Sequence, residues 1–180
     1  MKIADKTLET FQTKEIYVDI FTDHYDASFF GFIRIYNDNY VLLEHYNEDG
    51  FYNGIIVFRR QDITRIRWDN NEIKSAALIT TRQEKIKDLE FISIDSIESI
   101  IKSVDKAFGY VCLQIQDINS EWSIIGQLQE MDSETIVIKE FGTMSTLDRA
   151  MLMFSIDDVT RVDAGGLYEK NLMKIHKNNN

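Results

Sequence analysis

The segment Asp62-Ile-Thr-Arg-Ile66 returns later in the sequence as Asp158-Val-Thr-Arg-Val162, and this repeat decides how the 180 residues are organised. Around it, Gly31 aligns with Gly126 at an offset of 126 − 31 = 95 residues, and one inserted residue further on brings the two signatures into line. Apolar residues alternate with polar ones on both sides of each glycine, as strands with one buried face require. The sequence therefore contains two related stretches of β-strands.

The aligned positions of the two stretches share an apolar character. At the common offset, without a gap, the pairs are Ile16 with Val111, Val18 with Leu113, Ile20 with Ile115, Ile33 with Leu128, Val41 with Ile136 and Leu43 with Ile138. Each stretch is long enough to carry its own core, unlike the units of a solenoid, which have about 20 to 50 residues. We therefore predict two tandem modules, residues 1–90 with a charged connector at 80–90 and residues 91–180 with a C-terminal helix, which pair about a pseudo-twofold axis.

The hydrophobic pattern predicts a helix, then strands, then a helical segment in each module. We expect helices at 6–12, 72–79, 95–108 and 167–175, and strands of the first module at 16–21, 29–36, 40–46, 54–58 and 64–68. Asp95 is placed to cap the third helix and Gly109 to end it. The three-residue spacing of Ile63 and Ile66 predicts a 3₁₀ turn, capped by Asp62, that leads into the last strand. The predicted class is α+β, mainly β.

Composition and charge exclude several classes of protein. Hydrophobic residues make up 44% of the chain, enough for packed cores, and 30 acidic against 20 basic residues give a net charge of −10, which disfavours DNA and anionic membranes as partners. Cys112 is the only cysteine, so no internal disulfide forms and a reducing compartment is expected. Neither a signal peptide nor a membrane-spanning apolar run is recognisable, so we predict a cytoplasmic protein without membrane insertion.

Motifs for catalysis or for metal binding are missing from the sequence. The three histidines and Cys112 lack zinc-ligand spacing, and the alternating strand around Cys112 indicates a packing thiol rather than a nucleophile. No Gly-rich phosphate loop, nucleophile elbow or metalloprotease motif occurs. We predict no metal, no cofactor and no enzymatic activity, with an enzyme of unfamiliar type as a remaining alternative.

The run that begins Gly31-Phe-Ile-Arg-Ile-Tyr-Asn-Asp-Asn-Tyr-Val-Leu-Leu-Glu44 resembles the Sm-like superfamily and, within it, the Hfq proteins. The resemblance implies two tandem, small, strongly bent five-stranded antiparallel barrels of Sm-like or SH3-like form, each preceded by a helix and followed by a helical segment. It also implies rings assembled through strand edges and binding of single-stranded RNA. Fold carries over between relatives more readily than function, so the resemblance implies an RNA site only where the individual site residues match.

The residues that bind RNA in the family match poorly. The aromatic residue that stacks on a base, eight positions after the glycine, corresponds to Asn39 in the first module and Glu134 in the second. The aromatic and basic run before the last strand corresponds to Phe58-Arg-Arg60 in the first module but to Phe154-Ser-Ile156 in the second. The resemblance therefore favours the fold more than the RNA-binding function.

Four arginines gather at one edge of the first module and are the candidate contact residues: Arg59, Arg60, Arg65 and Arg67. Guanidinium groups bind phosphate or carboxylate, so this edge could hold an anion, RNA or a protein partner. A solvated edge with local ion pairs is the alternative. The second module has acidic residues at the corresponding places, Asp157, Asp158 and Asp163, which suggests that the two edges face each other, within one chain or between chains.

No single motif assigns a function. We expect a non-enzymatic cytoplasmic binding or adaptor protein that acts through protein contacts or self-association, with its many aromatic residues either in the cores or in an exposed patch. The alternative is a single-stranded RNA-binding protein that uses the edge from Arg59 to Arg67.

Overall fold

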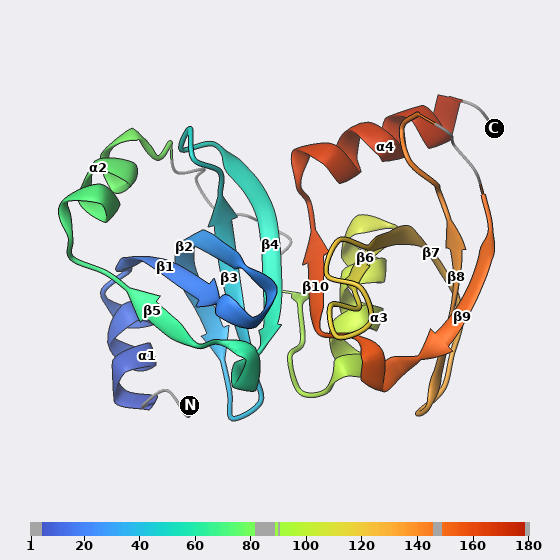
Figure 1. The fold of residues 1–180 in the computed structure, drawn as a ribbon, viewed down its shortest axis with the longest axis horizontal. Coiled ribbons are helices and arrows are strands. Elements are labelled where there is room, and N and C mark those ends of the chain that lie inside the picture. Colours follow the sequence, from blue (N-terminus) through green and yellow to red (C-terminus); the bar gives the residue numbers. More distant parts are fainter. Residues whose placement is uncertain (1–4, 82–88, 90, 146–148, 179–180) are drawn as a thin grey trace. The chain divides into compact units, whose positions relative to one another are not determined.

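The computed structural model describes residues 5–81, 89, 91–145 and 149–178. The chain folds into two compact units, Met1–Ile86 (unit 1) and Lys87–Asn180 (unit 2). Most of the predicted connector, residues 82–88 and 90, lies outside the described residues. Figure 1 shows strands flanked by helices in both units.

Unit 1 consists of a helix, five antiparallel strands and a second helix. The elements are α1 (Asp5–Thr13), β1 (Tyr17–Thr22), β2 (Ala27–Tyr36), β3 (Tyr40–Tyr46), β4 (Tyr52–Arg59), β5 (Arg65–Arg67) and α2 (Asn71–Ile79), with single 3₁₀ turns η1 (Asp23–Tyr25) and η2 (Arg60–Asp62). The strands lie in the order β5-β1-β2-β3-β4. The predicted strands of this module and both predicted helices are confirmed, with ends that differ by a few residues.

Unit 2 has the same order of helices and strands. They are α3 (Ile97–Phe108), β6 (Val111–Gln114), β7 (Ser123–Met131), β8 (Thr135–Glu140), β9 (Met151–Ser155), η4 (Ile156–Asp158), β10 (Arg161–Ala164) and α4 (Leu167–Asn178). The strand order β10-β6-β7-β8-β9 repeats that of unit 1, with β10 in the place of β5. The helix α3 begins after a capping box of Ser96 and Ser99, one residue later than the predicted Asp95 cap, and ends at Gly109 as predicted.

The predicted pair of closed five-stranded barrels is wrong. In the described strands of unit 1, β5 and β4 lie at opposite ends of the order and do not pair with each other, and the same holds for β10 and β9 in unit 2. The strand β5 has only three residues, and all three are engaged in the ladder with β1. The strands therefore form an open antiparallel sheet in an α+β fold.

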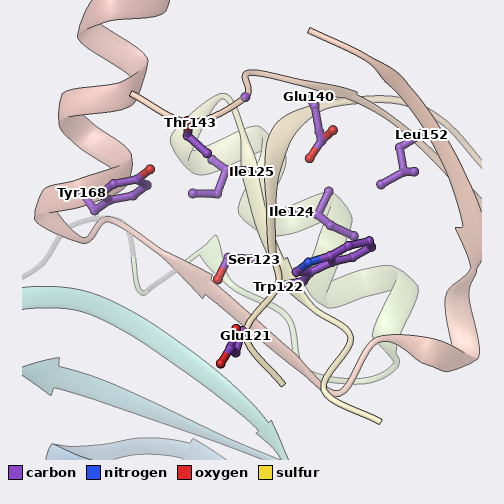
Figure 2. Close-up of a pocket in the computed structure, with 10 residues that line it drawn as sticks. Glu121, Trp122, Ser123, Ile124, Ile125, Glu140, Thr143, Leu152 and Tyr168 are labelled. Atoms are coloured by element: carbon purple, nitrogen blue, oxygen red, sulfur yellow. The ribbon is translucent and has the colours of Figure 1, made fainter. Parts of the chain in front are cut away.

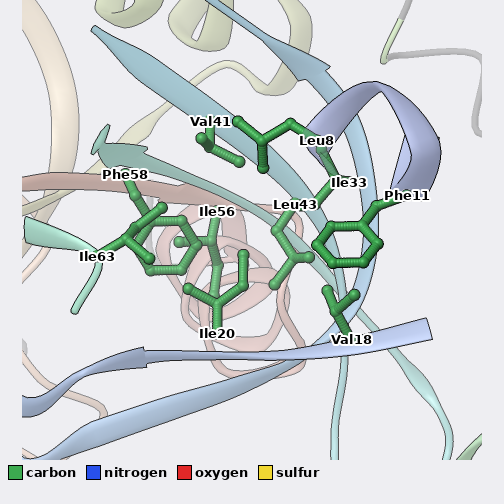
Figure 3. Close-up of a cluster of buried hydrophobic side chains, with 10 residues drawn as sticks. All are labelled: Leu8, Phe11, Val18, Ile20, Ile33, Val41, Leu43, Ile56, Phe58 and Ile63. Carbon is green, nitrogen blue, oxygen red and sulfur yellow. The ribbon is translucent and has the colours of Figure 1, made fainter. Parts of the chain in front are cut away.

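Unit 1 buries both faces of its strands. Tyr17 and Val18 are neighbours in β1, so their side chains point to opposite faces. Val18 joins the core under α1, which supplies Leu8 and Phe11 (Figure 3). Tyr17 joins a smaller cluster around Ile73 of α2. The two helices thus cover opposite faces of the strands.

Unit 2 repeats this arrangement on a different set of residues. Tyr110 and Cys112 share a cluster with Leu172 of α4. The alternate residues Val111 and Leu113 are fully buried and point to the other face, the one that α3 covers. The helices that precede and follow the strands of unit 2 thus again cover opposite faces.

A close approach of two strands occurs at the glycine of each unit. Gly31 lies between Val18 of β1 and His45 of β3, and Gly126 lies between Val111 of β6 and Glu140 of β8. A Cβ atom would come within 1.9 Å of the Glu44 carbonyl oxygen at Gly31 and within 2.3 Å of the Lys139 carbonyl oxygen at Gly126. A register shift follows a few residues later in both β2 and β7. These strands bend at a point where only glycine fits.

The gap-free alignment before the glycines is wrong by two residues. The ladders pair Val18 with Gly31 and Val111 with Gly126, so Val18 corresponds to Val111 rather than to Leu113. The connection between β6 and β7 is longer than the η1 connection between β1 and β2. The residues that precede these connections therefore do not align at the offset that holds for the residues that follow them. Correctly placed, Tyr17-Val18 matches Tyr110-Val111, an identity that the sequence comparison missed.

The repeated signature forms the entry to the last strand of each unit. A 3₁₀ turn leads into a short last strand as predicted, but it covers Arg60–Asp62 and ends before Ile63, so Asp62 belongs to the turn and the predicted Asp62 cap is wrong. The backbone N–H of Thr64 donates to the Phe21 carbonyl at 2.9 Å, and that of Thr160 donates to the Gln114 carbonyl at 2.8 Å. The shared threonine thus ties the last strand to the first.

The bend predicts that any side chain in place of the glycine strongly lowers the free energy of unfolding. Gly126→Ala should lower the free energy of unfolding by about 3 kcal/mol, since the new methyl group meets backbone that the ladder holds. Gly109→Ala is the matched control in unit 2, because its Cβ would meet no atom within 4 Å, and its positive φ should cost only about 1 kcal/mol. Urea denaturation followed by circular dichroism measures both; equal losses would contradict the account of the bend.

Candidate functional site

The structure disperses the four predicted arginines over three places in unit 1. Arg60 is almost fully buried, and its guanidinium donates to the Asp5 carboxylate at 2.6 Å and to the Asn37 carbonyl at 3.0 Å. It therefore joins α1 to the turn between β2 and β3. Arg59, the last residue of β4, pairs with Asp62 of the 3₁₀ turn at 2.5 Å.

Arg65 and Arg67 are brought together around one ring. The guanidinium of Arg65 lies 3.6 Å from the centroid of Phe21, and that of Arg67 lies 5.3 Å from it. Arg65 binds the Asp23 carboxylate through Nε at 2.9 Å and Nη2 at 2.8 Å. Arg67 binds Asp19 at 2.7 Å. These pairs neutralise most of the positive charge of the strand β5.

The carboxylates of this edge have opposite electrostatic settings. Hydrogen bonds from Arg65 and Thr64 lower the pKa of Asp23 to about 2. Burial raises the pKa of Asp19, and the hydrogen bond from Arg67 opposes that rise. Asp19 is fully buried, so Arg67 supplies the counter-charge that its ionised form needs.

The corresponding place in unit 2 holds Cys112 instead of a carboxylate. Cys112 lies opposite Asp163 in the ladder, as Asp19 lies opposite Arg67. Asp163 pairs with Arg161 at 2.9 Å in its own strand. Burial raises the pKa of the Cys112 thiol well above its usual value, and a buried protonated thiol is a poor nucleophile.

Unit 2 also contains a groove with a volume of about 580 Å³, which we call the unit-2 groove (Figure 2). Its lining comes from the start of β7, the end of β8, β9 and the first turn of α4: Glu121, Trp122, Ser123, Ile124, Ile125, Glu140, Gly142, Thr143, Leu152 and Tyr168. Ile124 and Ile125 are buried neighbours in β7 that point to opposite faces, so Ile124 lies on the side of Glu140 and Leu152, and Ile125 lies on the α4 side (Figure 2). Trp122 and Tyr168 are exposed by 57% and 45%, so two aromatic side chains stand at its wall with much of their surface in solvent.

Glu140 is the polar group that enters this apolar surface. Figure 2 shows its carboxylate above Ile124, with Leu152 directed toward the same space. Burial raises the pKa of Glu140. Within the part of the chain that the structure describes, its carboxylate has neither an ion-pair partner nor a hydrogen-bond donor. An uncompensated carboxylate beside apolar side chains is suited to a cationic ligand.

The strand β9 borders the unit-2 groove through Leu152. It pairs with β8 from Met151 to Ser155 and ends the strand order of unit 2. Met151 and Met153 are exposed by 62% and 71%. An apolar edge strand therefore lies beside an apolar groove.

Sequence reasoning did not identify the groove residues. Trp122, Glu140 and Tyr168 are far apart in the chain, and none belongs to a motif. The usable signal was the departure between the two modules at aligned positions: Glu140 stands where unit 1 has His45, and Ile124 stands where it has Phe29. Both pairs stand at the common offset of 95 residues.

No protein-family model, no curated protein and no solved structure matches the chain. The Sm-like resemblance thus stays a prediction. Among the described residues, none of the helices has the length and apolar character needed to cross a membrane. Over the same residues, His, Cys, Asp and Glu side chains form no group of three or more that could hold a metal ion.

The arginine pairs predict unequal effects of substitution. Arg60→Met should lower the free energy of unfolding by about 2 kcal/mol, because it removes charge-assisted hydrogen bonds that join α1 to a buried turn. Arg65→Met should have a smaller effect, since its pair with Asp23 is exposed to solvent. Thermal and urea unfolding measure both variants. A larger loss for Arg65→Met would show that the edge, rather than the buried contact, holds unit 1 together.

Proposed function

We propose that the protein is a non-enzymatic, cytoplasmic binding protein that takes up an extended segment of a partner protein along β9 and in the unit-2 groove. The observation that carries the proposal is the apolar groove beside an apolar edge strand. Edge strands present unpaired backbone N–H and C=O groups, and peptides bind to such edges as added strands. A groove next to the edge supplies the specificity that backbone pairing lacks.

The alternation of β9 supports this mode of binding. Met151 and Met153 point to one side of the strand, and Leu152 points toward the unit-2 groove. A segment paired with β9 would place alternate side chains against the methionines and into the groove. Methionine adapts to different partners because its side chain is flexible and polarisable.

We infer that the two units descend from one module and that only the second kept an open groove. They share the strand order, the glycine at the bend and the turn in which Asn37 or Asp132 accepts two backbone N–H groups. In unit 1 the ring of Phe29 packs on His45 and on Phe58, with centroids 5.7 and 5.3 Å apart. Rings therefore fill the space that Ile124 and Glu140 leave open in unit 2.

The alternative function, binding of single-stranded RNA through the arginine edge, has less support. Each of Arg59, Arg60, Arg65 and Arg67 already pairs with a carboxylate of unit 1. Binding of phosphate would require these pairs to break, and the net charge of −10 opposes the approach of RNA.

Selection of linear peptides from a random display library on the full chain tests the proposal. We expect enriched peptides whose affinity falls about tenfold in Trp122→Ala, because this change removes a wall of the groove. Met153→Lys should weaken the same peptides through the edge strand. Phe51→Ala is the control, since Phe51 is 63% exposed but belongs to unit 1.

Two results would overturn the proposal. One is a selection that enriches no peptide above the background of the bare support. The other is a set of peptides that binds Trp122→Ala and Met153→Lys as tightly as the unchanged chain. In a parallel titration, single-stranded RNA that binds in a salt-sensitive manner and is lost in Arg65→Glu would favour the alternative function.

A further inference from the structure

We propose that the unit-2 groove selects a basic side chain, a lysine or an arginine of the bound segment, and that Glu140 is its counter-charge. The inference rests on the proposed function and adds the chemistry of the side chain that enters the groove. It comes from four properties of the site: the position of Glu140, the lack of a cation near it among the described residues, the aromatic walls, and the contrast with unit 1.

The backbone fixes Glu140 at the end of β8. Its N–H donates to the Ala150 carbonyl at 2.9 Å, and the residue lies opposite Gly126 in the ladder with β7. Because Gly126 has no side chain, nothing from that position covers the carboxylate. Figure 2 shows the carboxylate above Ile124 and beside Leu152. A ligand in the groove would therefore meet a carboxylate whose strand position is set before binding.

The described residues supply no cation to this carboxylate. Burial is the cause of the raised pKa of Glu140, and no neighbouring positive charge opposes it. Lys139 precedes it in β8, so its side chain points to the opposite face of the strand. Partial burial of a carboxylate without a partner is unfavourable, and an ammonium or guanidinium group would remove that cost by an ion pair.

The walls of the groove fit the rest of such a side chain. Ile124 and Leu152 offer apolar surface to the methylene groups of a lysine or an arginine. Trp122 offers an aromatic ring on the same side as Ile124, and Tyr168 offers one on the α4 side (Figure 2); the faces of such rings attract cations. Glu121 adds a second carboxylate to the lining. An anionic or a purely apolar side chain would leave Glu140 without a partner.

Unit 1 provides an internal contrast. At the position that corresponds to Glu140 it has His45, whose ring packs on Phe29 at 5.7 Å. A histidine thus stands in unit 1 where unit 2 has a carboxylate, so a cationic ligand should distinguish the two units. The two tryptophans serve as reporters, since Trp68 belongs to unit 1 and Trp122 to the unit-2 groove.

A titration of the full chain with n-butylammonium, monitored by the two indole N–H signals in ¹H–¹⁵N NMR spectra, tests the inference. The signal of Trp122 should shift in a saturable manner while that of Trp68 does not. Butyrate and n-butanol at the same concentration and ionic strength should produce much smaller shifts. Glu140→Gln keeps the size of the side chain and should weaken binding of n-butylammonium at least about tenfold.

Two control variants separate a local ion pair from general attraction to an acidic protein. Glu134→Gln removes a charge from the exposed turn between β7 and β8 and should leave the affinity unchanged. Glu121→Gln should weaken binding less than Glu140→Gln, since Glu121 is exposed. Unchanged dispersion of the backbone signals in each variant shows that unit 2 remains folded.

The outcomes distinguish this inference from the proposed function. Equal shifts of Trp122 with n-butylammonium and n-butanol, or unchanged affinity in Glu140→Gln, would overturn selection of a cation even if peptides bind the groove. Binding of n-butylammonium that depends on Glu140, together with a selection that enriches no peptide, would instead uphold the cation site and overturn the protein-binding proposal. Selected peptides that contain no lysine or arginine would also contradict the inference.

Discussion

The bend at Gly31 and Gly126 is the constraint on which the rest of each unit depends. At both positions a carbonyl oxygen of the neighbouring strand occupies the space of a Cβ atom, so the strands approach more closely than any other residue would permit. The bend lets one set of alternating residues enclose a core beneath α1 or α3. The opposite set remains available for α2 or α4. The repeated threonine, which directly precedes the short last strand, then ties that strand to the first strand of its unit.

The same frame accommodates two different surfaces. Unit 1 fills its interior with aromatic rings and matches the arginines of its edge with carboxylates. Unit 2 has smaller or charged residues at the corresponding positions, which leaves a groove with one uncompensated carboxylate. The sequence showed that the two modules differ in charge, but it did not show where a ligand could bind. The arginines of unit 1 pair with carboxylates of the same unit. The groove of unit 2, with Glu140, does not include the acidic residues that the sequence pointed to.

The periodicity of the sequence predicted the helices and the strands of unit 1 because each of these elements buries a regular set of apolar residues. It could not predict closure of the sheets, since pairing between end strands leaves no mark on the pattern of any one strand. The sequence alignment of β1 with β6 was wrong because the connections that follow these two strands differ in length. The groove was missed for another reason: Trp122, Glu140, Leu152 and Tyr168 come from separate segments, and each is ordinary in its own segment.

The central claim is that the contact surface lies on unit 2 and not on the arginine edge of unit 1. Hydrogen–deuterium exchange of the full chain, with and without a saturating amount of the tightest peptide from the selection, measures this directly. The account predicts slower exchange in β9 and at the start of β7, with no change in β5. Protection of β5 and of the Arg59–Asp62 segment, without protection of β9, would contradict it.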